Sequence, residues 1–125
     1  MTNYQIADFL IRLKNASMAN LKVVEVAKTK VISAVAKTLK KEGFLDTVTE
    51  KQGVITVTLS IFRKKPVLSN VKIISRPGLR IYKNVDELES IKTPEMFIIS
   101  TPKGVMSHKT AIKQRVGGEV IAKVI

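Results

Sequence analysis

Residues 100–104 bring together side chains suited to binding a polar ligand. Ser100 and Thr101 supply two hydroxyls at the end of a predicted strand. Lys103 adds a cation, and Gly104 permits close approach of the backbone. Hydroxyls donate and accept hydrogen bonds, so they can contact a base edge, a ribose 2′-hydroxyl or a phosphate. An ordinary polar loop between a strand and a helix has the same composition, and composition alone gives the two interpretations about equal weight.

Two further residues have types that suit a ligand site. Tyr82 is predicted on the outward face of a strand, where its ring would stack on an unpaired base or cover the sheet edge. Periodicity favours neither alternative. Glu119 is the only acidic residue after Glu95 and lies in a basic segment. It is either a structural residue at the start of a strand or a carboxylate that orients a donor or accepts from a base amino group.

The first two predicted helices carry polar side chains on one face each. Arg12 and Asn15 are three residues apart on the first helix, and Lys30, Lys37 and Lys41 follow one face of the second. Such faces are usually only solvated, and we favour that interpretation for at least one of the lysines.

The sequence gives little support for an enzyme. The single histidine, His108, has no carboxylate close in sequence, and the chain contains no cysteine. One histidine without cysteine makes a zinc site improbable. The pair Gly117-Gly118 is not a dinucleotide-binding motif, and Gly104 is not followed by the residues of a phosphate-binding loop. We therefore predict no enzymatic activity and no cofactor.

The charge of the chain points to a polyanionic partner. Lysine and arginine number 22 against 10 acidic residues, which gives a net charge of +12. Residues 1–75 carry +8 (13 basic, 5 acidic) and residues 76–125 carry +4 (9 basic, 5 acidic), so folded surface rather than a tail is expected to bind it. No apolar run approaches the ~18 residues of a membrane span, and the N-terminus lacks a signal-peptide pattern. We predict an intracellular protein that binds nucleic acid and not a membrane.

Hydrophobic periodicity predicts an α+β fold of two small modules, the first with the order α-β-α-β-β. From residue 44 the period changes to two, and residues 55–61 give the clearest strand signal. Thr2 or Asn3 is a candidate N-cap, and Gly43 is expected to end the second helix. The predicted elements of this module, two helices on one small sheet, are a helix 4–18, a strand 23–26, a helix 29–42, a strand 55–61 and a strand 71–73.

The segment Arg76-Pro77-Gly78 is predicted to form a tight turn in which glycine supplies a positive φ. We place a boundary here, between domains 1–76 and 77–125. The second module is predicted to be mostly β with short helices, and Gly117-Gly118 is expected to end its last helix. Its predicted elements are a strand 79–83, a helix 85–89, a strand 96–100, a helix 107–114 capped by Ser107 and a strand 119–124.

Five segments of the chain carry motifs that are more specific than composition. They are Ile6–Ala16 (IADFLIRLKNA), Lys41–Phe44 (KEGF), Ser75–Lys83 (SRPGLRIYK), Ser100–Met106 (STPKGVM) and Gly117–Val120 (GGEV). In order and spacing they resemble the small-subunit (30S) ribosomal protein eight family, in its bacterial or organellar branch. The third segment is a very close match to the family's central signature, and the resemblance covers essentially the whole chain.

The resemblance implies a structural protein of the small subunit that binds the central domain of 16S rRNA and guides 30S assembly. In the family, the C-terminal domain grips an irregular helix of that RNA. Neighbouring small-subunit ribosomal proteins would be its other partners, and we expect a monomer off the ribosome. A cytoplasmic ribosome is expected, with an organellar one not excluded. The implied RNA-contacting residues are Arg12, Asn15, Lys30, Arg76, Arg80, Tyr82, Ser100, Thr101, Lys103, Gly104 and Glu119.

One residue departs from the family pattern, and two other binding functions remain open. Pro102 stands where the family commonly has a second serine, so a contact from that hydroxyl is absent or replaced here. The same surface would serve a translational repressor that binds its own mRNA, which family members can do. A general compaction protein would also account for the charge, although the five ordered motifs argue against it.

Overall fold

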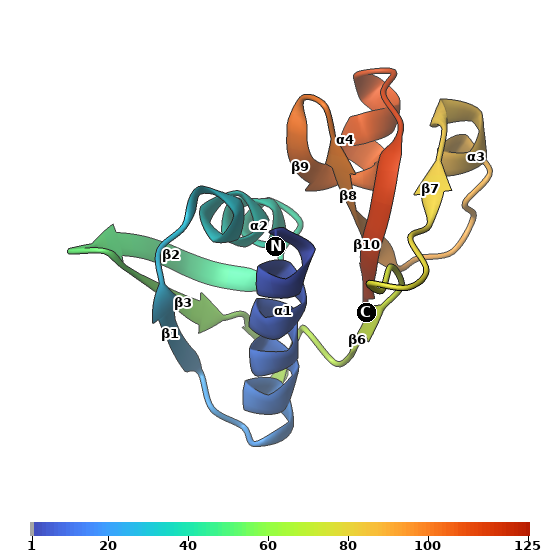
Figure 1. Ribbon diagram of the computed structural model, residues 1–125. Helices are drawn as coiled ribbons and strands as arrows, with labels where there is room; N and C mark the ends of the chain where they lie inside the picture. The colour runs from blue at the N-terminus through green and yellow to red at the C-terminus, as the bar shows by residue number, and fades with distance from the viewer. Residues whose placement is uncertain (1) are drawn as a thin grey trace.

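The computed structural model describes the backbone of residues 2–125 and the side chains of residues 5–125. The fold class is α+β, as predicted (Figure 1). The N-cap prediction for Thr2 or Asn3 falls outside the described side chains. The elements are α1 (Thr2–Met18), β1 (Val23–Ala27), α2 (Lys30–Lys41), β2 (Leu45–Lys51), β3 (Val54–Leu59), β4 (Ile61–Phe62), β5 (Lys65–Pro66), β6 (Val71–Ile73), β7 (Tyr82–Lys83), α3 (Val85–Glu89), β8 (Met96–Thr101), β9 (Gly104–Ser107), α4 (His108–Lys113) and β10 (Gly118–Val124).

Helices α1 and α2 cover one face of a three-stranded antiparallel sheet with the order β1-β3-β2 (Figure 1). In the central strand β3, Ile55, Val57 and Leu59 are buried against the helices, and the residues between them are less buried. This alternation is typical of a strand with one packed face. Burial of each such aliphatic side chain stabilises the fold by about 1.5–3 kcal/mol.

Helix α2 begins and ends where the sequence predicts. The Thr29 hydroxyl accepts the N–H of Ile32 at 3.1 Å and caps the helix. Gly43 has φ +91°, and the N–H of Phe44 donates to the carbonyl of Leu39 at 2.9 Å. Glycine adopts this backbone conformation without strain, so the helix stops here.

The first sheet contains β2 as its third strand, whereas the sequence predicts Val71–Ile73 in that position. That segment instead pairs with β10 in the other sheet. Strand β2 has only one buried residue, so it lacks the alternation that identifies β3. The prediction for Ile61 was also wrong. Strand β3 ends at Leu59, and Ile61 is 42% exposed at the start of a separate hairpin of β4 and β5.

Strand β10 is central to the second sheet, which has the order β6-β10-β8-β9 with β7 also paired to β10 (Figure 1). Helix α3 contacts α4 and β7, and α4 also contacts β8 and β9. Residues 120–122 of β10 are all buried. The C-terminal part is therefore mostly β with short helices, as predicted.

Three predictions for this part were wrong in detail. Only Tyr82 and Lys83 of the predicted strand 79–83 pair with β10, because Leu79 closes a turn in which it and Arg76 exchange two backbone hydrogen bonds of 2.9 Å. Gly78 lies in this turn without a positive φ. Residues 101–104 lead into strand β9 rather than directly into a helix.

Helix α4 is capped by Ser107, as predicted, but does not end at the glycine pair. The C-terminal residue with left-handed backbone is Arg115, at φ 57°. The N–H of Val116 donates to the carbonyl of Ala111 at 3.0 Å and closes the last turn. Gly117-Gly118 therefore has another role, described below.

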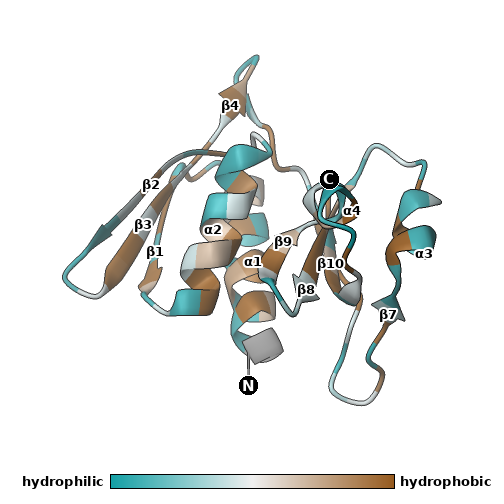
Figure 2. Ribbon diagram, turned by 90° about the horizontal axis from the view of Figure 1, so that it is seen from above, coloured by the Kyte–Doolittle hydropathy of each residue, from teal (hydrophilic) through white to brown (hydrophobic). Residues whose placement is uncertain are grey.

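One hydrophobic core joins the two halves of the chain. Ile6 and Leu10 of α1 belong to the same buried cluster as Ile55 of β3 and Val124 of β10. Figure 2 shows hydrophobic residues (brown) alternating with hydrophilic ones (teal) along α1 and α2. No helix within residues 2–125 has the length and apolar character that crossing a membrane requires. The division into domains 1–76 and 77–125 stays a prediction, with β6 hydrogen-bonded to the C-terminal sheet.

Candidate nucleic-acid interface

Three of the predicted residues, from separate segments, lie side by side on the C-terminal sheet. Glu119 of β10 is paired with Tyr82 of β7 on one side and with Ser100 of β8 on the other. Residues directly opposite in antiparallel strands share a face, with Cβ atoms about 4.5–5.5 Å apart. We call Tyr82, Glu119 and Ser100 the cross-strand row. Tyr82 is 65% exposed, Ser100 is half-buried and Glu119 is buried.

An ion pair holds Arg80 against the cross-strand row. The Arg80 Nη1 atom lies 3.3 Å from Oε2 of Glu119. The side chain of Glu119 is 11% exposed and that of Arg80 is 30% exposed, so solvent screens the pair only in part. A guanidinium has five N–H donors, and a carboxylate that orients it leaves donors for a further acceptor such as a phosphate.

Ser75 fixes the segment that carries Arg80 and Tyr82. Its buried hydroxyl donates to the carbonyl of Val120 at 2.7 Å and accepts the N–H of Ile81 at 3.0 Å. The sequence indicates this serine only as part of a motif and does not predict its positioning role. Its place directly before the Arg-Pro-Gly turn is the one signal that could have indicated it.

The glycine pair allows β10 to start close to its neighbours. A Cβ atom added at Gly117 would lie 2.5 Å from the carbonyl oxygen of Lys83. One added at Gly118 would lie 2.1 Å from the carbonyl oxygen of Ser100. Both contacts are with backbone atoms, so any other residue here would push the strands of the cross-strand row apart. No local sequence signal predicts this role, because the close approach involves three separate segments.

The hairpin between β8 and β9 is tied internally by Thr101. The hydroxyl of Thr101 donates to the carbonyl of Gly104 at 2.8 Å and accepts the N–H of Lys103 at 3.1 Å. Gly104 has φ +117°, a conformation that other residues adopt only with strain. Pro102 occupies the tip, where its fixed φ suits a tight turn. Thr101 and Gly104 therefore shape the turn and present the exposed Lys103.

The cross-strand row and the hairpin together present several groups of different chemistry. Ser100 presents a half-buried hydroxyl beside Glu119. No ion pair among the described side chains engages Lys103. A hydroxyl, a cation, an exposed phenol ring and an oriented guanidinium can bind the sugars, phosphates and unstacked bases of a nucleic acid.

The other predicted residues lie elsewhere on the surface. Arg76 is exposed at the start of the turn that Leu79 closes. Arg12 and Asn15 are exposed on α1, and Lys30 is exposed at the start of α2. The Arg12 Nε atom lies 3.4 Å from Oδ2 of Asp8, but both side chains are more than half exposed, so the pair contributes little stability.

Arg12 lines a groove of about 200 Å³ between α1, β1 and the start of α2. Thr29, which directly precedes Lys30, lines the same groove. The structure therefore brings Arg12 close to the start of α2 and keeps it apart in the fold from the cross-strand row.

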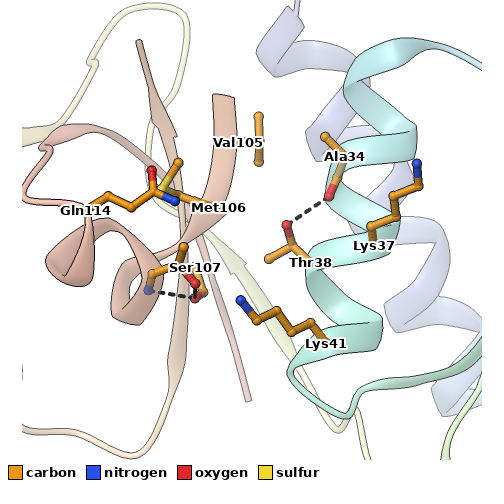
Figure 3. A pocket seen from close by; sticks show the side chains of 9 residues that line it. Ala34, Lys37, Thr38, Lys41, Val105, Met106, Ser107 and Gln114 are labelled. Atoms are coloured by element: carbon orange, nitrogen blue, oxygen red, sulfur yellow. Dashed lines mark hydrogen bonds between the residues drawn. The ribbon is translucent and has the colours of Figure 1, made fainter. Parts of the chain in front are cut away.

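A cleft of about 340 Å³ separates α2 from β9 and α4 (Figure 3). Lys37 and Lys41 line one side of it, and Ser107 and Gln114 line the other. Figure 3 shows Lys41 reaching from α2 toward Ser107. The lysine spacing in the sequence indicated a basic face on α2, but the cleft depends on packing between the halves and was not predicted.

His108 is a structural residue. It is 4% exposed, and its Nδ1 atom accepts the N–H of Phe97 at 3.1 Å. Burial lowers the pKa of His108, so the imidazole is neutral around pH 7. Within the described residues, no group of three or more His, Cys, Asp or Glu side chains could hold a metal ion.

Comparison with known proteins places these features in a family context. A family profile described as ribosomal protein S8 matches residues 4–125. The chain is 41% identical over 122 residues to the small ribosomal subunit protein uS8 of Acinetobacter baumannii, covering 94% of this chain and 93% of the relative. It is 38% identical over 120 residues to the protein of the same name from Nitratidesulfovibrio vulgaris, covering 95% of each.

Proposed function

The chain belongs to the ribosomal protein S8 family, and from this premise we propose that it binds the central domain of 16S rRNA directly. It is a structural, non-enzymatic component of the small ribosomal subunit, associated with rRNA and other ribosomal proteins. On this proposal, binding occurs early and guides the folding of the RNA during 30S assembly. The cross-strand row is the observation that supports it most strongly, because it gathers binding groups from three strands.

In the proposed contact, different groups supply the affinity for RNA and the selectivity for one RNA structure. Exposed cations such as Lys103 and Arg76 neutralise phosphates and release counterions, which gives affinity without selectivity. A-form RNA hides its base edges in a deep, narrow groove, so selectivity comes from shape, ribose hydroxyls and unstacked bases. The Ser100 hydroxyl and the Tyr82 ring suit these targets. Glu119 acts by orienting Arg80.

The remaining proposed contacts are in supporting roles. Thr101 and Gly104 keep the hairpin in shape, and Arg12, Asn15 and Lys30 contact the RNA backbone from the N-terminal half. We propose that the chain has two domains, in which residues 1–76 supply the contacts of the N-terminal half and residues 77–125 supply those of the cross-strand row and its hairpin. Repression of its own mRNA would use the cross-strand row as well. The proposal is completed by a monomer off the ribosome and by a cytoplasmic ribosome, or an organellar one, as the place of action.

Ser100→Ala tests the role of the cross-strand row. We expect it to weaken binding to an irregular helix from the central domain of 16S rRNA about tenfold, and binding to a regular duplex hardly at all. Ser60→Ala is a matched control, since Ser60 is also half-buried but lies in the N-terminal half. Equal losses on both RNAs would remove Ser100 from the selective contact.

A further inference from the structure

Residues 61–66 form a short hairpin that projects from the N-terminal half (Figure 2). Ile61 pairs with Pro66 and Phe62 pairs with Lys65, which leaves a tip of two residues. Residues 61–65 are all exposed. A hairpin this short buries too little surface to be stable without support from the rest of the fold. The exposed side chains of the hairpin therefore contribute little to the stability of the fold.

The tip consists of two cations in an unfavourable backbone conformation. Arg63 has φ 52° and Lys64 has φ 66°, so both are left-handed. Two-residue hairpin tips of this geometry favour Asn-Gly, because large side chains are strained there. The hairpin of β2 and β3 has a more favourable tip, Gln52-Gly53, with φ 52° and 77°. Large basic side chains thus occupy a tip where backbone preference alone would select other residues.

The hairpin combines an exposed ring with a cluster of cations. Phe62 is 64% exposed, and the Arg63 guanidinium carbon lies 5.2 Å from its ring centroid. A cleft of about 520 Å³ beside the hairpin is lined by Lys22, Arg63 and Lys64 together with Asn20, Ile61 and Pro66. Among the described side chains, no ion pair involves Lys22, Arg63, Lys64 or Lys65.

We propose that this hairpin is a second RNA contact, which takes an unpaired nucleotide. The base stacks on Phe62 or on the guanidinium of Arg63, and the phosphates lie against Lys22 and Lys64. An acidic protein surface would also attract the cations, but in a nucleic acid every phosphate has a planar base beside it, which matches a ring placed next to cations. The inference rests on the proposed RNA-binding function but uses none of the residues of the cross-strand row.

Phe62→Trp supplies the direct measurement, since the chain has no tryptophan and base stacking quenches indole emission. The probe is an oligoadenylate of about ten nucleotides, added to the full chain across a salt series. We expect quenching that saturates, and in the otherwise unchanged chain we expect Phe62→Ala to weaken binding about tenfold.

The double change R63N/K64G removes both tip cations and installs the favoured turn, so the hairpin is retained. For single-stranded RNA, the negative slope of log affinity against log salt should become less steep by about 1.4, because two phosphate contacts are lost. Lys51→Ala, next to the tip of the β2–β3 hairpin, is the control for the general loss of surface charge.

The outcomes separate this inference from the proposed function. A separate site is supported if the hairpin variants lose binding to oligoadenylate but still bind the irregular helix. Ser100→Ala should then do the opposite: it should lose binding to the irregular helix and still bind oligoadenylate. The inference is overturned if oligoadenylate causes no quenching, even if the irregular helix still binds. It is also overturned if R63N/K64G and Lys51→Ala change the salt dependence of binding equally. It would also be overturned if R63N/K64G kept oligoadenylate binding but lost binding to a purified small-subunit ribosomal protein.

Discussion

Replacing Gly118 with alanine should damage the fold and the proposed RNA site together. The added Cβ atom would lie 2.1 Å from the carbonyl oxygen of Ser100 and 2.9 Å from its carbonyl carbon. Contacts of a Cβ atom under 3.0 Å are essentially never seen, so the backbones must separate by about 0.9 Å at this point. Both atoms are in the backbone of a hydrogen-bonded strand, which cannot move aside as a flexible side chain can.

The size of the effect follows from the cost of overpacking. Inserting a methyl group into closely packed structure costs about 1–3 kcal/mol, and the short contacts with backbone atoms of Ser100 and Thr101 favour the upper end of that range. A loss of about 3 kcal/mol corresponds to a fall in melting temperature of about 10 °C for a chain of this size. Because Ser100 itself is displaced, affinity for the irregular RNA helix should also fall about tenfold.

Urea denaturation and RNA titration of the variant test both parts of this prediction. Gly78→Ala is the matched control, because nothing lies within 4 Å of the Cβ position there and φ is not positive. We expect the control to match the wild type within about 0.5 kcal/mol. If Gly118→Ala is as stable as Gly78→Ala and binds RNA equally well, close backbone approach does not position the cross-strand row.

Three other changes test separate parts of the account. Gly104→Ala should lower the unfolding free energy by about 1–2 kcal/mol, because φ +117° is strained for alanine. If urea denaturation gives Gly104→Ala the same unfolding free energy as Gly78→Ala, this prediction is wrong. Glu119→Gln removes the charge that pairs with Arg80 and should cost about 1–2 kcal/mol and weaken RNA binding; a titration that matches the wild type would refute the orienting role. Burial, and to a lesser extent Lys109, lowers the pKa of His108, so the unfolded state takes up the proton first and the unfolding free energy should fall as the pH drops below about 6.5. His108→Gln should flatten that dependence, and an unchanged slope would assign it to another group.

Local signals in the sequence were sufficient for the helices and for the strands with one packed face. The cap at Thr29, the stop at Gly43 and the alternation in β3 each act within a few residues, so a single segment contains the information. Helix α3 has the predicted bounds, and its Asn84 cap pairs reciprocally with Glu87.

The errors concern features that depend on a distant partner. Val71–Ile73 reads as a strand, but whether it joins β3 or β10 depends on contacts across the chain. Leu79 continues a regular alternation, yet its hydrogen bonds with Arg76 take it out of the strand. The roles of Ser75 and Gly118 exist only once β7, β8 and β10 are assembled.

The candidate site was predictable in its residue types but not in its arrangement. The motifs indicated Tyr82, Ser100 and Glu119 individually, and pairing through β10 brings them into one row. The ion pair between Arg80 and Glu119 joins two residues that are 39 positions apart. The contact of each of these residues with RNA stays a prediction.

The most direct test of the central claim is binding of the full chain to an irregular helix from the central domain of 16S rRNA, compared with a regular duplex of equal length across a salt series. We expect both affinities to fall as salt rises, with the irregular helix still bound at salt concentrations that abolish duplex binding. Equal affinities that collapse together would mean that the net charge of +12 alone drives binding, and would contradict recognition by the cross-strand row.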